Sequence, residues 1–204
     1  MTIIKDIYKA IFGKNYDQAW KQFATENNAT YNETYNSVEI TYANHKILFD
    51  THVHYSVSGG QSFDTAYTRV RVEFISPDNL RFRLTKQVLI DGIGKLLGAQ
   101  DIQIGDKEFD KRFLIKGNDE FKVQTLLSNN TIKNLILQQS DISLHLLDNE
   151  GIFEDRIPEG LTMLYYVSET VIKETKQLTD LLNLYKNLID QLTKLGSAKA
   201  LKTN

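Results

Sequence analysis

Three side chains of the metal-binding types alternate along one short segment of the chain, Asp50, His52 and His54. In a strand all three would point to the same face, because side chains alternate with a period of two. Two imidazoles and a carboxylate could hold zinc or another divalent ion, with Glu39 or Glu73 as a fourth ligand. The same residues also fit a solvated polar face on which the imidazoles pair with carboxylates. The residue types alone leave both interpretations open.

Four arginines form a second candidate group, and their guanidinium groups suit phosphate and carboxylate ligands. A hairpin that pairs Val72 with Phe82 places the apolar side chains of its two strands on one face. Phe74 then lies opposite Leu80. The arginines share the other face, which is also the face of Asp50. The four are Arg69, Arg71, Arg81 and Arg83.

This register places Arg71 opposite Arg83, and like charges directly opposite each other are unfavourable. A bound anion would relieve the repulsion, so the arginine face is a candidate anion-binding site. Acidic side chains on neighbouring strands, Glu39, Asp50 and Glu73, offer the alternative relief. The arginines would then form an ordinary solvated face.

The strands that carry both groups are predicted by hydrophobic alternation with a period of two, from about residue 38 to residue 90. Turn residues at 44–45, 58–62 and 76–78 divide this stretch into a four-stranded antiparallel β-meander. In the first hairpin, Ile40 is expected opposite Phe49, and Tyr42 opposite Ile47. Later strands at 101–104, 113–116, 143–147 and 161–167 extend the sheet.

Helical spacing of apolar residues predicts helices on the apolar face of this sheet. N-terminal helices are expected at 2–12 and 16–26, and a central helical pair follows the cap at 118–120 and is broken at 128–130. Segment 90–98 fits either a short helix or a loop. A long C-terminal helix at 168–195 is expected to pack on the sheet, and the alternative is a projecting helix that forms a homodimer. The predicted fold class is α+β, in a single domain over residues 1–204.

The composition excludes several classes of function. The 204 residues include no Cys, which rules out disulfides, Cys-ligated metals and thiol nucleophiles. A net charge of −2 argues against nucleic acid as a partner. No run of about 18 apolar residues predicts a transmembrane segment, and no signal peptide is recognisable, so a cytoplasmic location is expected. Gly92, Gly94 and Gly98 do not match the dinucleotide-binding spacing, and no cofactor is expected.

A motif in the middle of the chain carries a resemblance to a known group of proteins. Its residues are Gly105, Asp106, Phe109, Asp110 and Phe113, followed by Ile115, Lys116, Gly117, Asn118, Asp119 and Glu120 and by the pair Leu126 and Leu127. Over about residues 100–140 the chain resembles an uncharacterised bacterial protein family, a domain of unknown function with a G-D-x-x-F-D-x-x-F motif. The resemblance implies no catalytic residue. The motif itself predicts a structural role, with a turn at Gly105 and two phenyl rings that anchor a strand to the core.

The residues taken together favour a non-enzymatic binding or protein-interaction module. Its partner is expected to be another protein or a small anionic ligand held by the arginine face. The alternative is a metal-dependent or hydrolytic enzyme that uses Asp50, His52 and His54.

Overall fold

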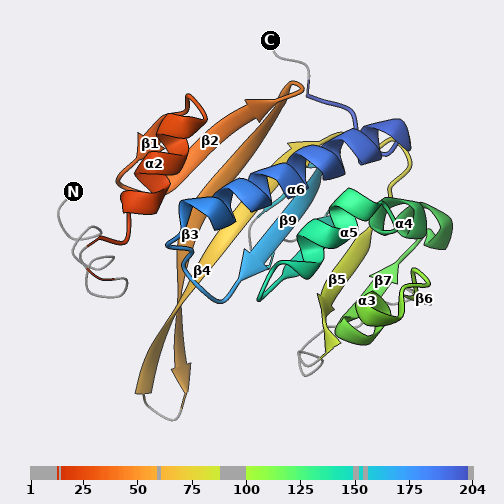
Figure 1. The fold of residues 1–204 in the computed structure, drawn as a ribbon, viewed down its shortest axis with the longest axis horizontal. Helices are drawn as coiled ribbons and strands as arrows, with labels where there is room; N and C mark the ends of the chain where they lie inside the picture. Colours follow the sequence, from red (N-terminus) through yellow and green to blue (C-terminus); the bar gives the residue numbers. More distant parts are fainter. Residues whose placement is uncertain are drawn as a thin grey trace.

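The computed structural model describes residues 13, 15–58, 61–87, 100–148, 152–153 and 156–201. Within them, nine antiparallel strands form one sheet in the order β1-β2-β3-β4-β9-β8-β5-β7-β6 (Figure 1). The strands are β1 Tyr31–Asn32, β2 Ser37–Tyr42, β3 His45–Ser58, β4 Gln61–Phe74, β5 Phe82–Lys86, β6 Gln100–Ile102, β7 Phe113–Gly117, β8 Ser143–Leu147 and β9 Thr162–Ser168. The helices are α2 Gln18–Glu26, α3 Lys107–Arg112, α4 Glu120–Leu127, α5 Asn130–Leu137 and α6 Thr175–Lys194.

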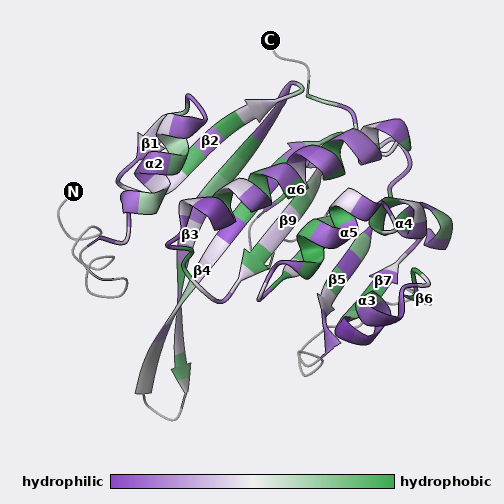
Figure 2. Ribbon diagram, viewed as in Figure 1, coloured by the Kyte–Doolittle hydropathy of each residue, from purple (hydrophilic) through white to green (hydrophobic). Residues whose placement is uncertain are grey.

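The α+β class is confirmed, and the main core lies between the helices and one face of the sheet. The buried residues of α2, α3, α4, α5 and α6 join a single cluster with the inward side chains of the strands. Helix α6 crosses the sheet along most of its width (Figure 1). Its outward side is mainly hydrophilic (Figure 2), while eight of its residues, from Leu178 to Leu192, are buried. The C-terminal helix therefore packs on its own sheet, as expected.

The meander holds for β2, β3 and β4, but the predicted fourth strand is not the neighbour of β4. Strands β9 and β8 lie between β4 and β5. Val72 therefore pairs with Leu164 instead of Phe82, and Phe74 pairs with Thr162 instead of Leu80. All seven residues of β9 are buried. A strand buried on both faces belongs in the centre of a sheet, and the apolar alternation of β4 and β5 fits β9 and β8 as well as it fits a direct hairpin.

The first hairpin is shifted by two residues from the predicted pairing. Ile40 pairs with Ile47, and Tyr42 pairs with His45. Ala43 and Asn44 form the turn, both with positive φ angles of 46° and 63°. Two such residues in succession are the requirement of a type I′ turn. Because the shift is an even number of residues, the predicted apolar face is kept.

The described helices α2, α4, α5 and α6 match the predicted ones, except that α6 begins later. Helix α2 falls within the predicted segment 16–26, and α4 and α5 begin after the N-caps Asp119 and Asn129. Helix α6 begins only at Thr175, because Ile172 is held in an extended segment: its N–H donates to Thr68 Oγ1 (3.0 Å) and its carbonyl accepts from Trp20 Nε1 (2.9 Å). The predicted segments 2–12 and 90–98 lie outside the described residues.

Helix α3 was not predicted, and it occupies the motif that carries the family resemblance. Asp106 caps α3 by accepting from the N–H groups of residues 108 and 109. Asp110 accepts from the N–H groups of Ile104 (2.9 Å) and Gly105 (3.0 Å), so it closes the turn rather than pairing with a neighbouring cation. Phe109 and Phe113 are buried with ring centroids 4.8 Å apart. These contacts are all structural.

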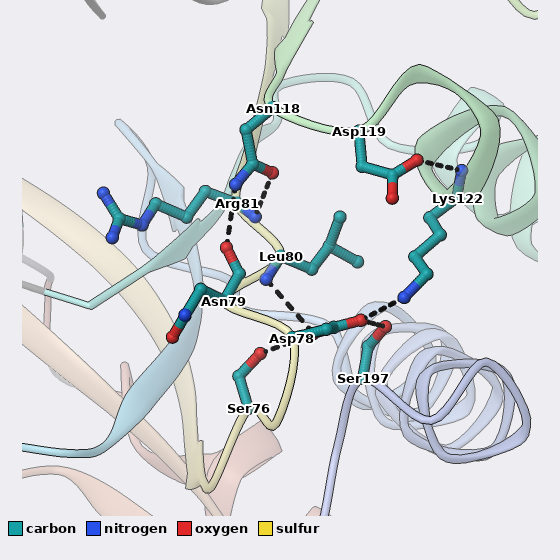
Figure 3. A network of polar contacts seen from close by, with 9 residues as sticks. All are labelled: Ser76, Asp78, Asn79, Leu80, Arg81, Asn118, Asp119, Lys122 and Ser197. Atoms are coloured by element: carbon teal, nitrogen blue, oxygen red, sulfur yellow. Dashed lines mark hydrogen bonds and ion pairs between the residues drawn. The ribbon is translucent and has the colours of Figure 1, made fainter.

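A polar network around Asp78 joins the connection between β4 and β5 to α4 and to the C-terminal segment (Figure 3). The carboxylate accepts from Ser197 Oγ at 2.6 Å, from Ser76 Oγ at 3.0 Å and from the N–H of Leu80 at 3.2 Å, and it forms an ion pair with Lys122. Burial alone would raise the pKa of Asp78, but these donors outweigh it and hold the pKa well below its usual range.

Candidate functional site

The candidate site lies on the sheet face opposite the main core, where β3 and β4 pair over their whole length. Asp50 pairs with Arg69 in this register, and Leu48 pairs with Arg71. The Asp50 carboxylate accepts from Arg69 Nε at 2.8 Å and from Arg69 Nη2 at 2.7 Å, which is a bidentate ion pair. It also accepts from Arg71 Nη2 at 2.5 Å. We call Asp50, Arg69 and Arg71 the arginine cluster.

Asp50 and Arg69 of the arginine cluster are buried, and Arg71 is half-buried. The side chains of Asp50 and Arg69 are each 9% exposed, and that of Arg71 is 17% exposed. Two guanidinium groups face one carboxylate, so the cluster has a formal charge of +1. A charge held away from bulk water acts more strongly on an approaching ion than one on an open surface.

Two hollows meet beside the arginine cluster, and both are bounded by Leu48 and Arg71. The first hollow has a volume of about 510 Å³ and is lined also by Tyr35, Tyr55, Asp50 and Arg69. The second hollow has a volume of about 570 Å³ and is lined also by Glu39, Lys46, Glu73 and Met163. In the second hollow, Lys46 Nζ lies 3.1 Å from Glu39 Oε1. Both arginines of the cluster line the first hollow.

The first hollow exists because β2 stops pairing with β3 partway along it. The β2–β3 register ends at Phe49, while β3 continues to Ser58 beside β4 alone. The loop before β2 forms the opposite wall and is fastened to β3 by Asn36, which has a positive φ of 44°. Asn36 Nδ2 donates to Thr51 Oγ1 (3.3 Å), and Asn36 Oδ1 accepts from Tyr31 Oη (2.7 Å).

His52 and His54 lie on the same face as Asp50, as predicted, but they belong to an aromatic group. The ring of Phe153 lies 4.4 Å from that of His52, 5.7 Å from that of His54 and 4.7 Å from that of Tyr67, measured between centroids. The carboxylate of Asp50 faces the two arginines instead. Among the residues that the structure describes, no group of three or more His, Asp or Glu side chains is placed to hold a metal ion.

The four predicted arginines do not form one group. Arg71 lies opposite Tyr165, and Arg83 lies opposite His145 and Lys116. With β9 and β8 between them, β4 and β5 are about 14 Å apart at strand spacing. Arg81 forms an ion pair with Asp148. The like-charge pair Arg71–Arg83 is therefore wrong, because it depended on the direct β4–β5 hairpin.

A buried histidine on the same sheet face was not predicted as a site residue. His145 Nε2 lies 2.5 Å from Ser143 Oγ, and its Nδ1 has no hydrogen-bond partner among the described residues. Burial, together with the nearby charge of Arg83, lowers the pKa of His145 to about 3. The ring is therefore neutral at physiological pH. Its strand neighbours are buried on both sides, so the sequence offered no polar pattern that singles it out.

The fold and the site define an α+β protein whose helices pack on one face of a nine-stranded sheet and whose opposite face holds an arginine-lined hollow. No described helix is both long enough and apolar enough to cross a membrane. No protein-family model and no curated protein matches the chain. Among solved structures, the chain is similar to the mycobacterial trehalose monomycolate transport factor A, TtfA, with a TM-score of 0.49 and 8% identity over 93% of this chain and 99% of that chain. A likeness of this size says nothing about function.

Proposed function

We propose that this protein is a non-enzymatic binding module that takes an anionic ligand in the first hollow. The observation that carries the proposal is that two guanidinium groups, one buried and one half-buried, share one carboxylate at this hollow. Guanidinium groups favour a phosphate or carboxylate ligand, because they bind both through paired N–H donors.

Arg71 is the residue that meets the ligand. Arg69 is committed to Asp50 by two hydrogen bonds, whereas Arg71 gives Asp50 one short bond and is the most exposed of the three. Arg71 also borders both hollows. A ligand anion can therefore reach Arg71 without displacing the bidentate pair beneath it.

The walls of the first hollow favour a ligand that also has an apolar part. Leu48, Tyr35 and Tyr55 line it beside the charged residues, and the two tyrosines are each 61% exposed. An aromatic or aliphatic group on the ligand would remove these surfaces from water, which is favourable in proportion to the apolar area buried. Small-molecule sites commonly combine apolar walls with a few polar groups of this kind.

The position of Asp50 favours binding over catalysis. A general base or metal ligand needs a free carboxylate oxygen directed at its target. Both oxygens of Asp50 instead accept hydrogen bonds from arginine.

The test compares inorganic phosphate with phenyl phosphate by calorimetric titration and by the melting temperature. Both probes should bind the parent and raise its melting temperature, since a ligand of the folded state stabilises it. Phenyl phosphate should bind more tightly because its ring meets the apolar wall. Sodium chloride at matched ionic strength corrects for general salt effects.

Arg71→Ala should abolish both binding and stabilisation, while the bidentate pair beneath it keeps the fold. Arg81→Ala is the matched control, because Arg81 precedes β5, is paired with Asp148 and is separated from β4 by β9 and β8. An equal response of the parent and Arg71→Ala to both probes would overturn the proposed function.

A further inference from the structure

The hairpin of β3 and β4 extends beyond the rest of the sheet as a two-stranded ribbon (Figure 1). Its outer part, residues 53–58 of β3 and 61–67 of β4, pairs only within the hairpin among the described residues. Within the described part of the chain, the ribbon therefore has two open edges, one along β3 and one along β4. Open edges carry unpaired main-chain donors and acceptors, which template the addition of a further strand.

The open edge of β3 presents the main-chain groups of Val53, Tyr55 and Val57. In a hairpin closed by a two-residue turn, Tyr42 and His45 form a hydrogen-bonded pair, and such pairs recur at every second residue. The main-chain groups of odd-numbered residues of β3 therefore face β2, and beyond the end of β2 they face outward. Thr51 is buried against Asn36, so the open stretch begins at Val53.

This edge also exposes apolar side chains. Val57 is 77% exposed and Tyr55 is 61% exposed. Between Thr51 and Ser58 the edge has no lysine, no proline and no other charged residue that would discourage pairing with another strand. Natural edge strands are usually protected by such residues. On the β4 edge, by contrast, the outward residues include Asp64, a charge that discourages pairing.

We propose that the β3 edge is the interface of a homodimer, in which Val53–Val57 pairs antiparallel with the same residues of a second copy. The occupant is a second copy because the strand is self-complementary. With a two-fold axis at Tyr55, the two Tyr55 residues face each other and each Val53 faces the other copy's Val57. Every cross-strand pair on that side is then apolar or aromatic, and no like charges meet.

The geometry of the ribbon allows this pairing. The ribbon stands clear of the helices and of the remaining strands (Figure 1), so its edges are accessible to the ribbon of a second copy. Pairing of identical edges gives a closed dimer, whereas pairing of the β3 edge with the β4 edge of another copy would give open chains. The charge of Asp64 on the β4 edge favours the closed form. Val53 and Tyr55 also line the first hollow, so the interface borders the proposed anion site. The two proposals are tested separately, because the anion site is tested through Arg71.

The test is a charge exchange at the two-fold axis, read by sedimentation velocity over a range of concentrations. The parent should sediment as a dimer of the 23.4 kDa chain. Tyr55→Lys and Tyr55→Glu should each be monomeric, because each places like charges opposite each other at the axis. An equal mixture of the two variants should dimerise again. Only a residue that meets its own copy shows this recovery.

Two controls separate the interface from general effects on the fold. Val53→Pro and Ala66→Pro change directly opposite residues of the ribbon, and only Val53 has its N–H on the β3 edge. The first should be monomeric and the second dimeric. Phe121→Lys replaces another aromatic residue, 74% exposed on α4, and should leave the dimer intact. A parent that is monomeric at every concentration, or a dimer that persists in both Tyr55 variants, would overturn the proposal.

Discussion

Removal of the Asp50 carboxylate should destabilise the protein severely. Asp50→Ala removes three hydrogen bonds from the guanidinium groups of Arg69 and Arg71. The side chain of Arg69 is only 9% exposed. Loss of one partner from a buried ion pair costs about 3–5 kcal/mol, because the remaining charge loses its compensation. For a chain of this size that corresponds to a fall of about 6–20 °C in the melting temperature.

Two companion variants show whether this cost arises from the uncompensated charge. Arg71→Ala leaves the bidentate pair in place and should cost about 1.5–3 kcal/mol, the net contribution of a charged hydrogen bond. The double variant Asp50→Leu with Arg69→Met replaces the buried pair by apolar side chains. It should be more stable than Asp50→Ala alone, since such replacements are often neutral.

The assay is urea unfolding followed by the fluorescence of Trp20, the single tryptophan, which is fully buried. Inorganic phosphate adds a second readout, because an anion can replace the missing carboxylate between the two arginines. It should therefore raise the stability of Asp50→Ala more than that of the parent. If Asp50→Ala were no less stable than Arg71→Ala, or gained nothing extra from phosphate, the account of the arginine cluster would be refuted.

Four further outcomes test the fold. Val72→Asp places a charge in the core, on strand β4 between β3 and β9. It should lower the free energy of unfolding, measured with urea, by more than about 4 kcal/mol. The difference in the free energy of unfolding between the parent and Asp78→Asn should shrink as the pH falls below about 4. The lowered pKa of Asp78 stabilises the fold only while the carboxyl is ionised. The parent should lose up to about 1.4 kcal/mol per pH unit below pH 6.5 through His145, whose pKa is lowered in the folded state, and His145→Gln should lack this part of the slope in a pH series of urea titrations. Deletion of residues 171–204 removes α6 from the core and should yield aggregated protein by sedimentation; a cooperatively folding truncated chain would contradict the packing of α6.

Local patterns predicted most of the individual elements. Alternation located β2, β3 and β4, and capping residues located α4 and α5. These signals depend on neighbours a few residues apart. Helix α3 was not predicted because a helix of six residues is too short to show a helical period. The spacing of Phe109 and Phe113 fits a helix as well as a strand with a bend.

The same patterns could not predict the order of the strands in the sheet. The alternation in β4 and β5 states which side chains face the core, but not which strand lies alongside. Strand β9 enters the sheet from about 90 residues further along the chain and takes the position beside β4. Strand β9 takes this central position because it is buried on both faces. Such a strand shows no alternation of polar and apolar residues from which the sequence could predict its neighbours.

The residues of the predicted anion site differ from those of the observed arginine cluster because the strand order differs from the predicted order. The predicted anion site depended on Arg71 and Arg83 in adjacent strands, and that contact is lost with the direct β4–β5 hairpin. The contact of Asp50 with Arg69 depends only on the β3–β4 hairpin, in which Ser58 pairs with Gln61 and sets every other pair by counting. Arg71 follows two residues later on the same face and reaches the same carboxylate. The positive charge that a ligand would meet therefore comes from the two arginines of one hairpin.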